Sequence, residues 1–139
     1  MISTIAAATD GSATAGKAVE MARDFARRFD AKLVLLSAFK DSGRRARGDS
    51  VELQWATSNS ARVREILSRA EDQMRREGID CTTRVEEGDA ADVVVQLAAE
   101  CGADLLVIGN RGMQRRVLGS VPNMVPHRAP CSVRVVKTT

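Results

Sequence analysis

The sequence predicts an α/β fold with a parallel sheet of five strands, in the order 3-2-1-4-5, and helices on both faces of the sheet. Short apolar segments alternate along the chain with longer segments of helical periodicity, and this alternation is typical of parallel sheets. Three apolar segments are unbroken, as in buried central strands, whereas two alternate with polar residues, as in edge strands. The 139 residues suffice for one domain, residues 1–139, with its own hydrophobic core.

The first part of the chain predicts two central strands joined by a helix. Residues 2–8 form a small apolar run that ends at the turn Thr9-Asp10-Gly11-Ser12, with Ser12 as the N-cap of a helix over residues 13–29. Alanines recur at helical spacing in that helix and predict its buried side. The second strand is expected over residues 31–39, where the run from Leu33 to Leu36 is unbroken.

A loop, a long helix and an edge strand are expected next. Residues 40–50 predict a mobile loop, whose role the sequence does not define, with the basic group Arg44, Arg45 and Arg47. Asp49 and Glu52 predict a capping box at the start of a helix that ends at Gly78. Residues 79–85 alternate between apolar and polar side chains and predict a strand at a sheet edge.

The last part of the chain predicts a third helix and two further strands. Asp89 is expected as the N-cap of the helix, and Gly102 lies just past its end. Residues 105–108 are an unbroken apolar run and predict a central strand. A short helix over residues 120–127 then leads to a last strand over residues 131–137, which partly alternates and is the second edge.

The predicted strand order places a ligand crevice at the C-terminal ends of strands one and four, where the connections leave in opposite directions. Asp10 follows strand one, and the loop from Gly109 to Ser120 follows strand four. Gly109, Gly112 and Gly119 allow the backbone to turn or a ligand to come close. Ser120 begins a helix whose N–H groups suit a phosphate. Two independent arguments therefore predict one site with the shape of a nucleotide site.

The side chains at this site leave two interpretations open. Asp10 either caps the first helix or accepts from ribose hydroxyls and binds a phosphate-bound Mg²⁺. Arg111 either donates to phosphate oxygens or is solvated, as arginines on exposed loops usually are. Ser12 and Ser120 are expected as helix caps rather than nucleophiles, and His127 is expected in a structural or exposed role.

Composition argues against several other classes of function. The net charge of +3 and the pI near 9.1 are mild, and aromatic residues make up only 3% of the chain, so nucleic-acid binding is not expected. The apolar runs are too short to span a membrane, and the N-terminus lacks a signal-peptide pattern, so a cytoplasmic protein is expected. Three widely spaced cysteines and a single histidine predict reduced thiols near the core and no zinc site.

The chain resembles the universal stress protein family over essentially its full length. The motifs that carry the resemblance are Thr9-Asp10-Gly11-Ser12, Gly88-Asp89, the segment from Gly102 to Gly112, Gly119-Ser120-Val121 and the segment from His127 to Cys131. The resemblance implies a Rossmann-like fold, homodimers that often pair through the last strand, and a cytoplasmic role in stress. It also implies a division between members that bind ATP or cyclic AMP and members that bind no nucleotide.

The resemblance also implies a set of nucleotide-contact positions. Gly109, Gly112 and Gly119-Ser120 match the glycine pattern of the nucleotide-binding members, but the spacing between Gly112 and Gly119 is three residues shorter than in that pattern. The shortening falls in the loop that would wrap the phosphates. The positions implied for nucleotide contact are Asp10, Ala38, Gly109, Gly112, Gly119, Ser120 and Val121, with Arg111 as an added donor.

Three functional hypotheses follow. The leading one is a stress-response regulatory protein that binds ATP or another adenine nucleotide, with or without Mg²⁺, and turns it over slowly or not at all. The second is a dimeric stress protein that binds no nucleotide and acts through protein contacts, and the shortened loop favours it. The third is an adenylating or ATP-pyrophosphatase enzyme, which is disfavoured because neither a PP-loop nor an HxGH pair is present. The sequence does not identify the nucleotide, the inducing stress or the partner.

Overall fold

A computed structural model describes residues 1–11, 13–40, 50–110 and 125–137 of the chain. Within these residues the elements are β1 (Thr4–Ala8), α1 (Ala13–Phe29), β2 (Lys32–Phe39), α2 (Ser50–Arg76), β3 (Cys81–Glu87), α3 (Ala90–Glu100), β4 (Leu105–Gly109) and β5 (Ser132–Val136). Residues 125–128 are also helical. The expected loop over residues 41–49 and the start of the expected last helix lie outside the described residues.

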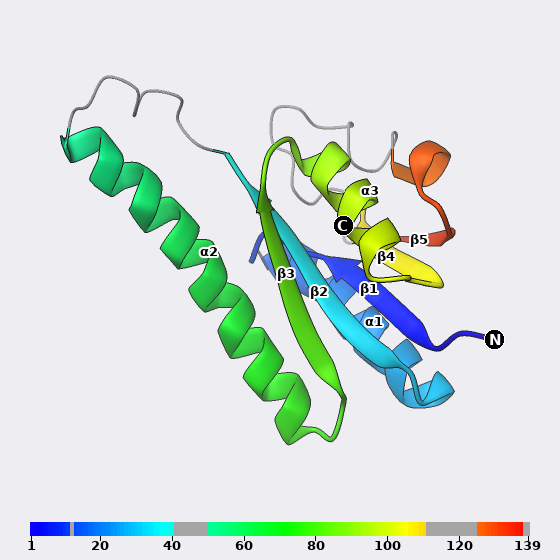
Figure 1. Ribbon diagram of the computed structural model, residues 1–139. Helices are drawn as coiled ribbons and strands as arrows, with labels where there is room; N and C mark the ends of the chain where they lie inside the picture. Colours follow the sequence, from blue (N-terminus) through cyan, green and yellow to red (C-terminus); the bar gives the residue numbers. More distant parts are fainter. Residues whose placement is uncertain (12, 41–49, 111–124, 138–139) are drawn as a thin grey trace.

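The strands form one parallel five-stranded sheet in the order β3-β2-β1-β4-β5. This order confirms the predicted topology, with β1 paired on both sides and β3 and β5 at the two edges. Figure 1 shows α3 in front of the sheet and α1 behind it. Helix α1 joins β1 to β2 across one face of the sheet, and helix α3 joins β3 to β4 across the other. The switch point lies between β1 and β4.

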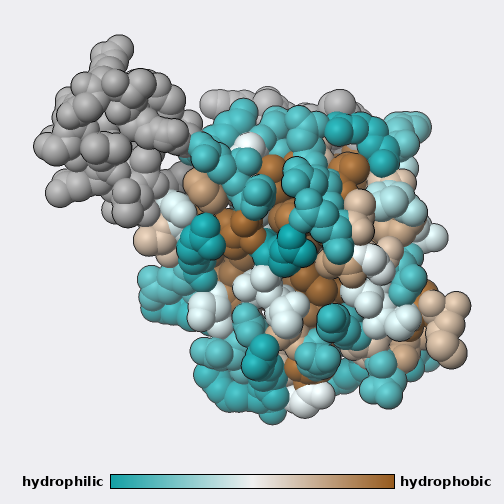
Figure 2. Space-filling view, in the orientation of Figure 1, coloured by the Kyte–Doolittle hydropathy of each residue, from teal (hydrophilic) through white to brown (hydrophobic). Residues whose placement is uncertain are grey.

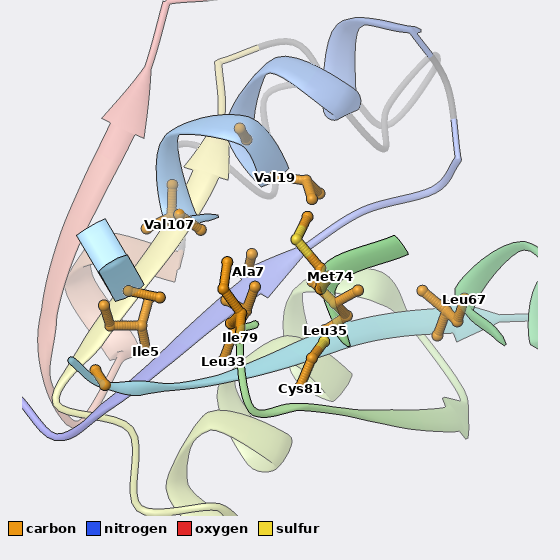
Figure 3. Close-up of a cluster of buried hydrophobic side chains, with 14 of the residues drawn as sticks. Ile5, Ala7, Val19, Leu33, Leu35, Leu67, Met74, Ile79, Cys81 and Val107 are labelled. Carbon is orange, nitrogen blue, oxygen red and sulfur yellow. The ribbon is translucent and has the colours of Figure 1, made fainter. Parts of the chain in front are cut away.

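Alternate residues of the central strands separate into two cores, one on each face of the sheet. Ile5, Leu33 and Val107 face helices α1 and α2, where they pack with Leu67 and Met74 (Figure 3). The intervening strand residues face α3, in a second cluster that includes Ala6, Val34, Leu36, Leu106 and Ile108. Because a strand directs successive side chains to opposite faces, these central strands need apolar residues at every position.

The surface on the α3 side is largely hydrophilic, and hydrophobic residues show in its middle (Figure 2). Within the described part of the chain, the helices are too short or too polar to cross a membrane.

Each of the helices α1, α2 and α3 ends in the same hydrogen-bonded turn. The residue after the C-cap has a positive φ, which is 56° at Asp30, 84° at Gly78 and 69° at Gly102. At α3, for example, Gly102 N–H donates to Ala99 O at 3.2 Å and Ala103 N–H donates to Ala98 O at 3.0 Å. These paired bonds are a Schellman motif, which satisfies the last carbonyls of a helix and turns the chain sharply into the next strand.

Two strands, β1 and β3, begin two residues later than the sequence predicts, and hydrogen bonds explain both differences. β3 begins at Cys81 rather than at residue 79, because Ile79 N–H donates to Met74 O at 3.0 Å and so belongs to the turn that closes α2. β1 begins at Thr4 rather than at residue 2. At and just before this start, the N–H groups of Ser3 and Thr4 donate to Asp104 Oδ2 at 2.9 and 3.0 Å, so they are bound by a side chain and not by a neighbouring strand. These two bonds also lower the pKa of the Asp104 carboxyl.

Helix α1 is joined to helix α2 by ion pairs at the end of the sheet where β2 and β3 begin. Glu77 Oε1 lies 2.6 Å from Arg27 Nη2 and 3.8 Å from Arg23 Nη1. A hydrogen bond from the Gln73 side chain and the two nearby arginines lower the pKa of the Glu77 carboxyl. The pairs are partly exposed, so their contribution to stability is modest.

Replacing Asp30 by glycine is expected to stabilise the protein. Asp30 holds a positive φ that costs free energy for a residue with a Cβ, and glycine removes that cost. Chemical denaturation should show a free energy of unfolding about 0.5–1 kcal/mol higher for Asp30→Gly.

The reverse change at the end of α3 is the control for this prediction. A Cβ at Gly102 would meet no other atom within 4 Å, so Gly102→Ala tests the backbone conformation alone. It should lower the free energy of unfolding by about 1 kcal/mol. An Asp30→Gly protein less stable than wild type would contradict this account of the helix end.

Candidate functional site

Three of the residues expected in the site follow or end three adjacent strands at the same edge of the sheet. Ala8 of β1 is level with Leu36 of β2, and Ala7 is level with Val107 of β4. Asp10 follows β1, Ala38 lies near the end of β2 and Gly109 ends β4. These three residues therefore lie at the C-terminal ends of adjacent strands, where the switch point was predicted.

The turn after β1 is held by Thr9, which the sequence analysis did not select as a site residue. Thr9 is 5% exposed, and its N–H donates to Leu36 O at 3.0 Å. Its Oγ1 accepts from Gly11 N–H at 3.0 Å, across the exposed residue Asp10. A threonine two residues before a glycine that follows a strand is a signal for this turn. The Thr9 side chain thus fixes the backbone on either side of the Asp10 carboxylate.

The ends of β2 and β3 form the next part of the site. Ala38 is half-buried and pairs with Glu86. Gly88 N–H donates to Phe39 O at 2.9 Å, so the chain that leads into α3 is joined to the end of β2. Gly88 has a φ of 146°, in the region that favours glycine.

Asp89 is the N-cap residue of α3, as expected, but its side chain does not make the usual capping hydrogen bond. Asp89 has an extended backbone. Its Oδ1 lies 3.9 Å from Lys40 Nζ instead, and both side chains are largely exposed. The predicted N-cap position is therefore confirmed, while the Asp89 side chain lies near Lys40, a residue 49 positions away in sequence.

Gly109 is buried at the end of β4, where it pairs with Val136. The next residue continues the ladder, since Asn110 N–H donates to Val136 O at 2.9 Å. The other residues predicted for this loop lie outside the described part of the chain. They are Arg111, Gly112, Gly119, Ser120 and Val121.

His127 is exposed on the helical segment over residues 125–128, as the sequence analysis expected. The neighbouring Arg128 ties this segment to the first turn of α3, with Nη1 2.8 Å from Asp92 Oδ1. Where the structure is described, His, Cys, Asp and Glu side chains do not gather in groups of three or more that could hold a metal ion.

The cysteines are free thiols, and their surroundings disfavour a role as nucleophiles. Burial raises the pKa of the Cys81 thiol to about 12 and also raises the pKa of Cys101 and of Cys131. Because the thiolate is the reactive form, these thiols are largely unreactive at neutral pH. Their positions in or against the two cores confirm that they lie near the core.

Comparison with known proteins relates the whole chain to one family. The profile of the universal stress protein family matches residues 1–137. The universal stress protein Rv1636 of Mycobacterium tuberculosis strain H37Rv is 37% identical over 145 residues, which cover 98% of this chain and 97% of that protein.

Solved structures of universal stress proteins also match the chain. A crystal structure of a universal stress protein in complex with cAMP is 32% identical, with a TM-score of 0.77 and coverage of 99% of each chain. The universal stress protein UspA of Lactobacillus plantarum has a TM-score of 0.84, with 98% of each chain covered and 23% identity, and it shares the fold.

Replacing Thr9 by valine is expected to loosen the turn after β1. Valine keeps the volume of threonine but cannot accept the Gly11 N–H, so one hydrogen bond is lost. The free energy of unfolding should fall by about 1 kcal/mol in chemical denaturation. The control is Thr82→Val on the edge strand β3, which should change it less; equal losses would show that the Thr9 bond has no special role.

Proposed function

Because this chain belongs to the universal stress protein family, we propose that it is a stress-response protein that binds an adenine nucleotide at the C-terminal ends of β1 and β4. Residues 1–139 act as one domain in this proposal, and the protein is placed in the cytoplasm. The nucleotide is bound rather than consumed, with little or no turnover.

The observation that carries the proposal is the convergence of Asp10, Ala38 and Gly109 at the switch point of the sheet. In open α/β sheets ligands bind in the crevice at this place. The relative that is 32% identical along 99% of this chain is described in complex with cAMP, which supports an adenine nucleotide as the ligand. The shared fold and the ligand of this relative thus support one ligand class for the proposed site.

Each of these three residues suits a different part of a nucleotide. The exposed carboxylate of Asp10 can accept hydrogen bonds from ribose hydroxyls and can bind a phosphate-bound Mg²⁺. Ala38 is half-buried and small, which leaves room for a flat base against the end of β2. Gly109 has no side chain and so lets the ligand approach the end of β4 closely.

The phosphates are assigned to the loop after β4. In the sequence, Gly112 and Gly119 suit turns, and Ser120 with Val121 suits the start of a helix, whose N–H groups would face an anion. Arg111 adds a guanidinium, which matches phosphate oxygens in geometry. Because the loop between the two glycines is short, it could limit how many phosphates the site holds. ATP, with three phosphates, and cyclic AMP, with one, are therefore useful probes.

Two features favour binding over catalysis. The three thiols have raised pKa values, so nucleophilic catalysis by cysteine is disfavoured. His127 is exposed beside an arginine that pairs with α3, so it is placed to contact solvent. A protein that holds a nucleotide without turning it over is suited to sensing that nucleotide.

A homodimer through β5 is the second part of the proposal. The edge strand β5 exposes Val135 to 37% and carries the half-buried Val133 beside it. The other edge strand, β3, ends instead in the exposed carboxylates Glu86 and Glu87. Charged residues protect a sheet edge from pairing. β5 has one charged residue, the exposed Arg134, whereas β3 has Arg84 as well as Glu86 and Glu87, so β5 is the edge that better suits a second copy of the chain. If no nucleotide binds, this surface supports the alternative function, a dimeric stress protein that acts through protein contacts.

Nucleotide binding predicts a loss of affinity when the Asp10 charge is removed. Calorimetry with ATP, ADP, AMP and cyclic AMP should detect binding of at least one of them to the wild-type protein. Asp10→Asn should weaken that binding about tenfold, as expected for the loss of a charged hydrogen-bond acceptor.

The matched control is Asp72→Asn on the exposed side of α2, which should bind as the wild type does. Absence of heat and of any thermal shift with all four nucleotides would end the proposal in favour of the alternative function.

The dimer predicts a change of mass when the β5 edge is charged. Val135→Lys should shift the protein toward the monomer in analytical ultracentrifugation, because the lysine would place a charge in the apolar edge. Glu86→Lys on the exposed part of β3 is the control and should leave the mass unchanged. Equal masses for wild type and Val135→Lys at low concentration would assign the interface elsewhere.

A further inference from the structure

The turn after β1 is in close contact with helix α2. Gly11 has a φ of 85°, and a Cβ placed on it would lie 2.9 Å from Ile66 Cγ2 and 3.0 Å from Ile66 Cδ1. Real Cβ atoms rarely approach a neighbour so closely, so the Ile66 side chain occupies the space that any other residue at position 11 would need.

Other glycines with a similar backbone conformation lack such a neighbour. Gly78 has a φ of 84°, and a Cβ there would meet no other atom within 4 Å. The same is true of Gly102, whose φ is 69°. At these two positions only the backbone conformation requires glycine. At Gly11 the contact with α2 is a second and separate requirement.

Ile66 lies on α2 next to a residue that anchors the helix. Leu67 is 1% exposed and belongs to the core cluster with Leu35 and Met74 (Figure 3). Ile66 is only half-buried, and its methyl groups reach Gly11 rather than being enclosed in the core. Helix α2, which packs on β2 and β3, thereby extends its contacts to the turn that follows β1.

Two contacts together hold the backbone at Gly11, the residue that follows Asp10. The Gly11 N–H is held by Thr9 Oγ1 at 3.0 Å, and the Gly11 Cα is covered by Ile66. If Ile66 were removed, Gly11 would be free to sample the wide range of conformations open to glycine, and the Asp10 carboxylate would lose one side of its support.

We propose that Ile66 is a positioning residue for the nucleotide site, through which helix α2 holds the turn that carries Asp10. This inference rests on the proposed function of that site. Because coupling between two parts of a protein is reciprocal, a bound nucleotide stabilises α2 where it meets the turn, and a shift of α2 weakens nucleotide binding. The position and stability of α2 near the turn therefore depend on whether the site is occupied.

The first test measures the turn itself, without a nucleotide. Ile66→Ala should speed hydrogen exchange of the Gly11 amide about tenfold, because the turn opens more often. Ile66→Val keeps Cγ2, the nearest atom to position 11, and should restore most of the protection. Met21→Ala, which removes half-buried atoms from α1, is the structural control and should leave this amide unchanged.

The second test compares the steric cost at Gly11 with and without Ile66. Gly11→Ala should lower the melting temperature more in the wild-type background than in the Ile66→Ala background, where the methyl groups that it would meet are absent. In the latter background the loss should match that of Gly78→Ala, which has nearly the same φ and no neighbour. Each loss is expected to be a few degrees.

The third test links the turn to the site, with ATP and cyclic AMP as probes. Ile66→Ala should weaken binding of whichever nucleotide binds the wild type about tenfold, and Ile66→Val should weaken it less. An unchanged Gly11 exchange rate, equal costs of Gly11→Ala in both backgrounds, or unchanged affinity in Ile66→Ala would each overturn the inference. If the wild type binds neither of these two nucleotides nor ADP or AMP, the proposed function fails, and the exchange and melting data alone decide whether Ile66 positions the turn.

Discussion

The whole structure depends on β1 being paired on both sides and covered on both faces. β1 is hydrogen-bonded to β2 and to β4, and its residues Ile5 to Ala8 are at most 2% exposed. Three of these four are alanines, which let the alanine-rich face of α1 and the helix α3 approach the sheet closely from either side. The chain turns at Thr9, whose N–H donates to Leu36 O and whose Oγ1 accepts from Gly11 N–H, so a polar turn follows the central strand. The candidate site is a direct consequence of this central strand.

Much of the fold could be predicted because it depends on local pattern. Unbroken apolar runs identified the central strands, and alternation identified β3 and β5 as edges, which was sufficient for the strand order. Glycines placed the ends of α2 and α3 correctly, since a positive φ is needed there. The local pattern did not show contacts between residues distant in sequence. Asp89 is the N-cap residue of α3, but its side chain lies near Lys40 and makes no capping bond. Asp104 binds the backbone before and at the start of β1.

The candidate site, like the fold, was only partly predictable from the sequence. Asp10, Ala38 and Gly109 could be predicted because the strand order alone decides which strand ends are adjacent. The contact between Gly11 and Ile66 could not be predicted, because it joins residues 55 positions apart. The spacing of apolar residues along a helix shows which side of the helix is buried, but not which loop the helix contacts. The sequence pattern predicted where a ligand could bind, and only the three-dimensional structure showed which residues hold the turn after β1.

The most direct test of the account is amide chemical-shift mapping of the labelled protein by nuclear magnetic resonance, with ATP and cyclic AMP added in turn. The account predicts that the largest shifts fall on Asp10, Gly11 and Asn110, at the C-terminal ends of β1 and β4, for at least one of the two nucleotides. It would be contradicted if millimolar nucleotide left these amides unchanged. Shifts confined to the opposite end of the sheet, around Ser3 and Asp104, would contradict it equally.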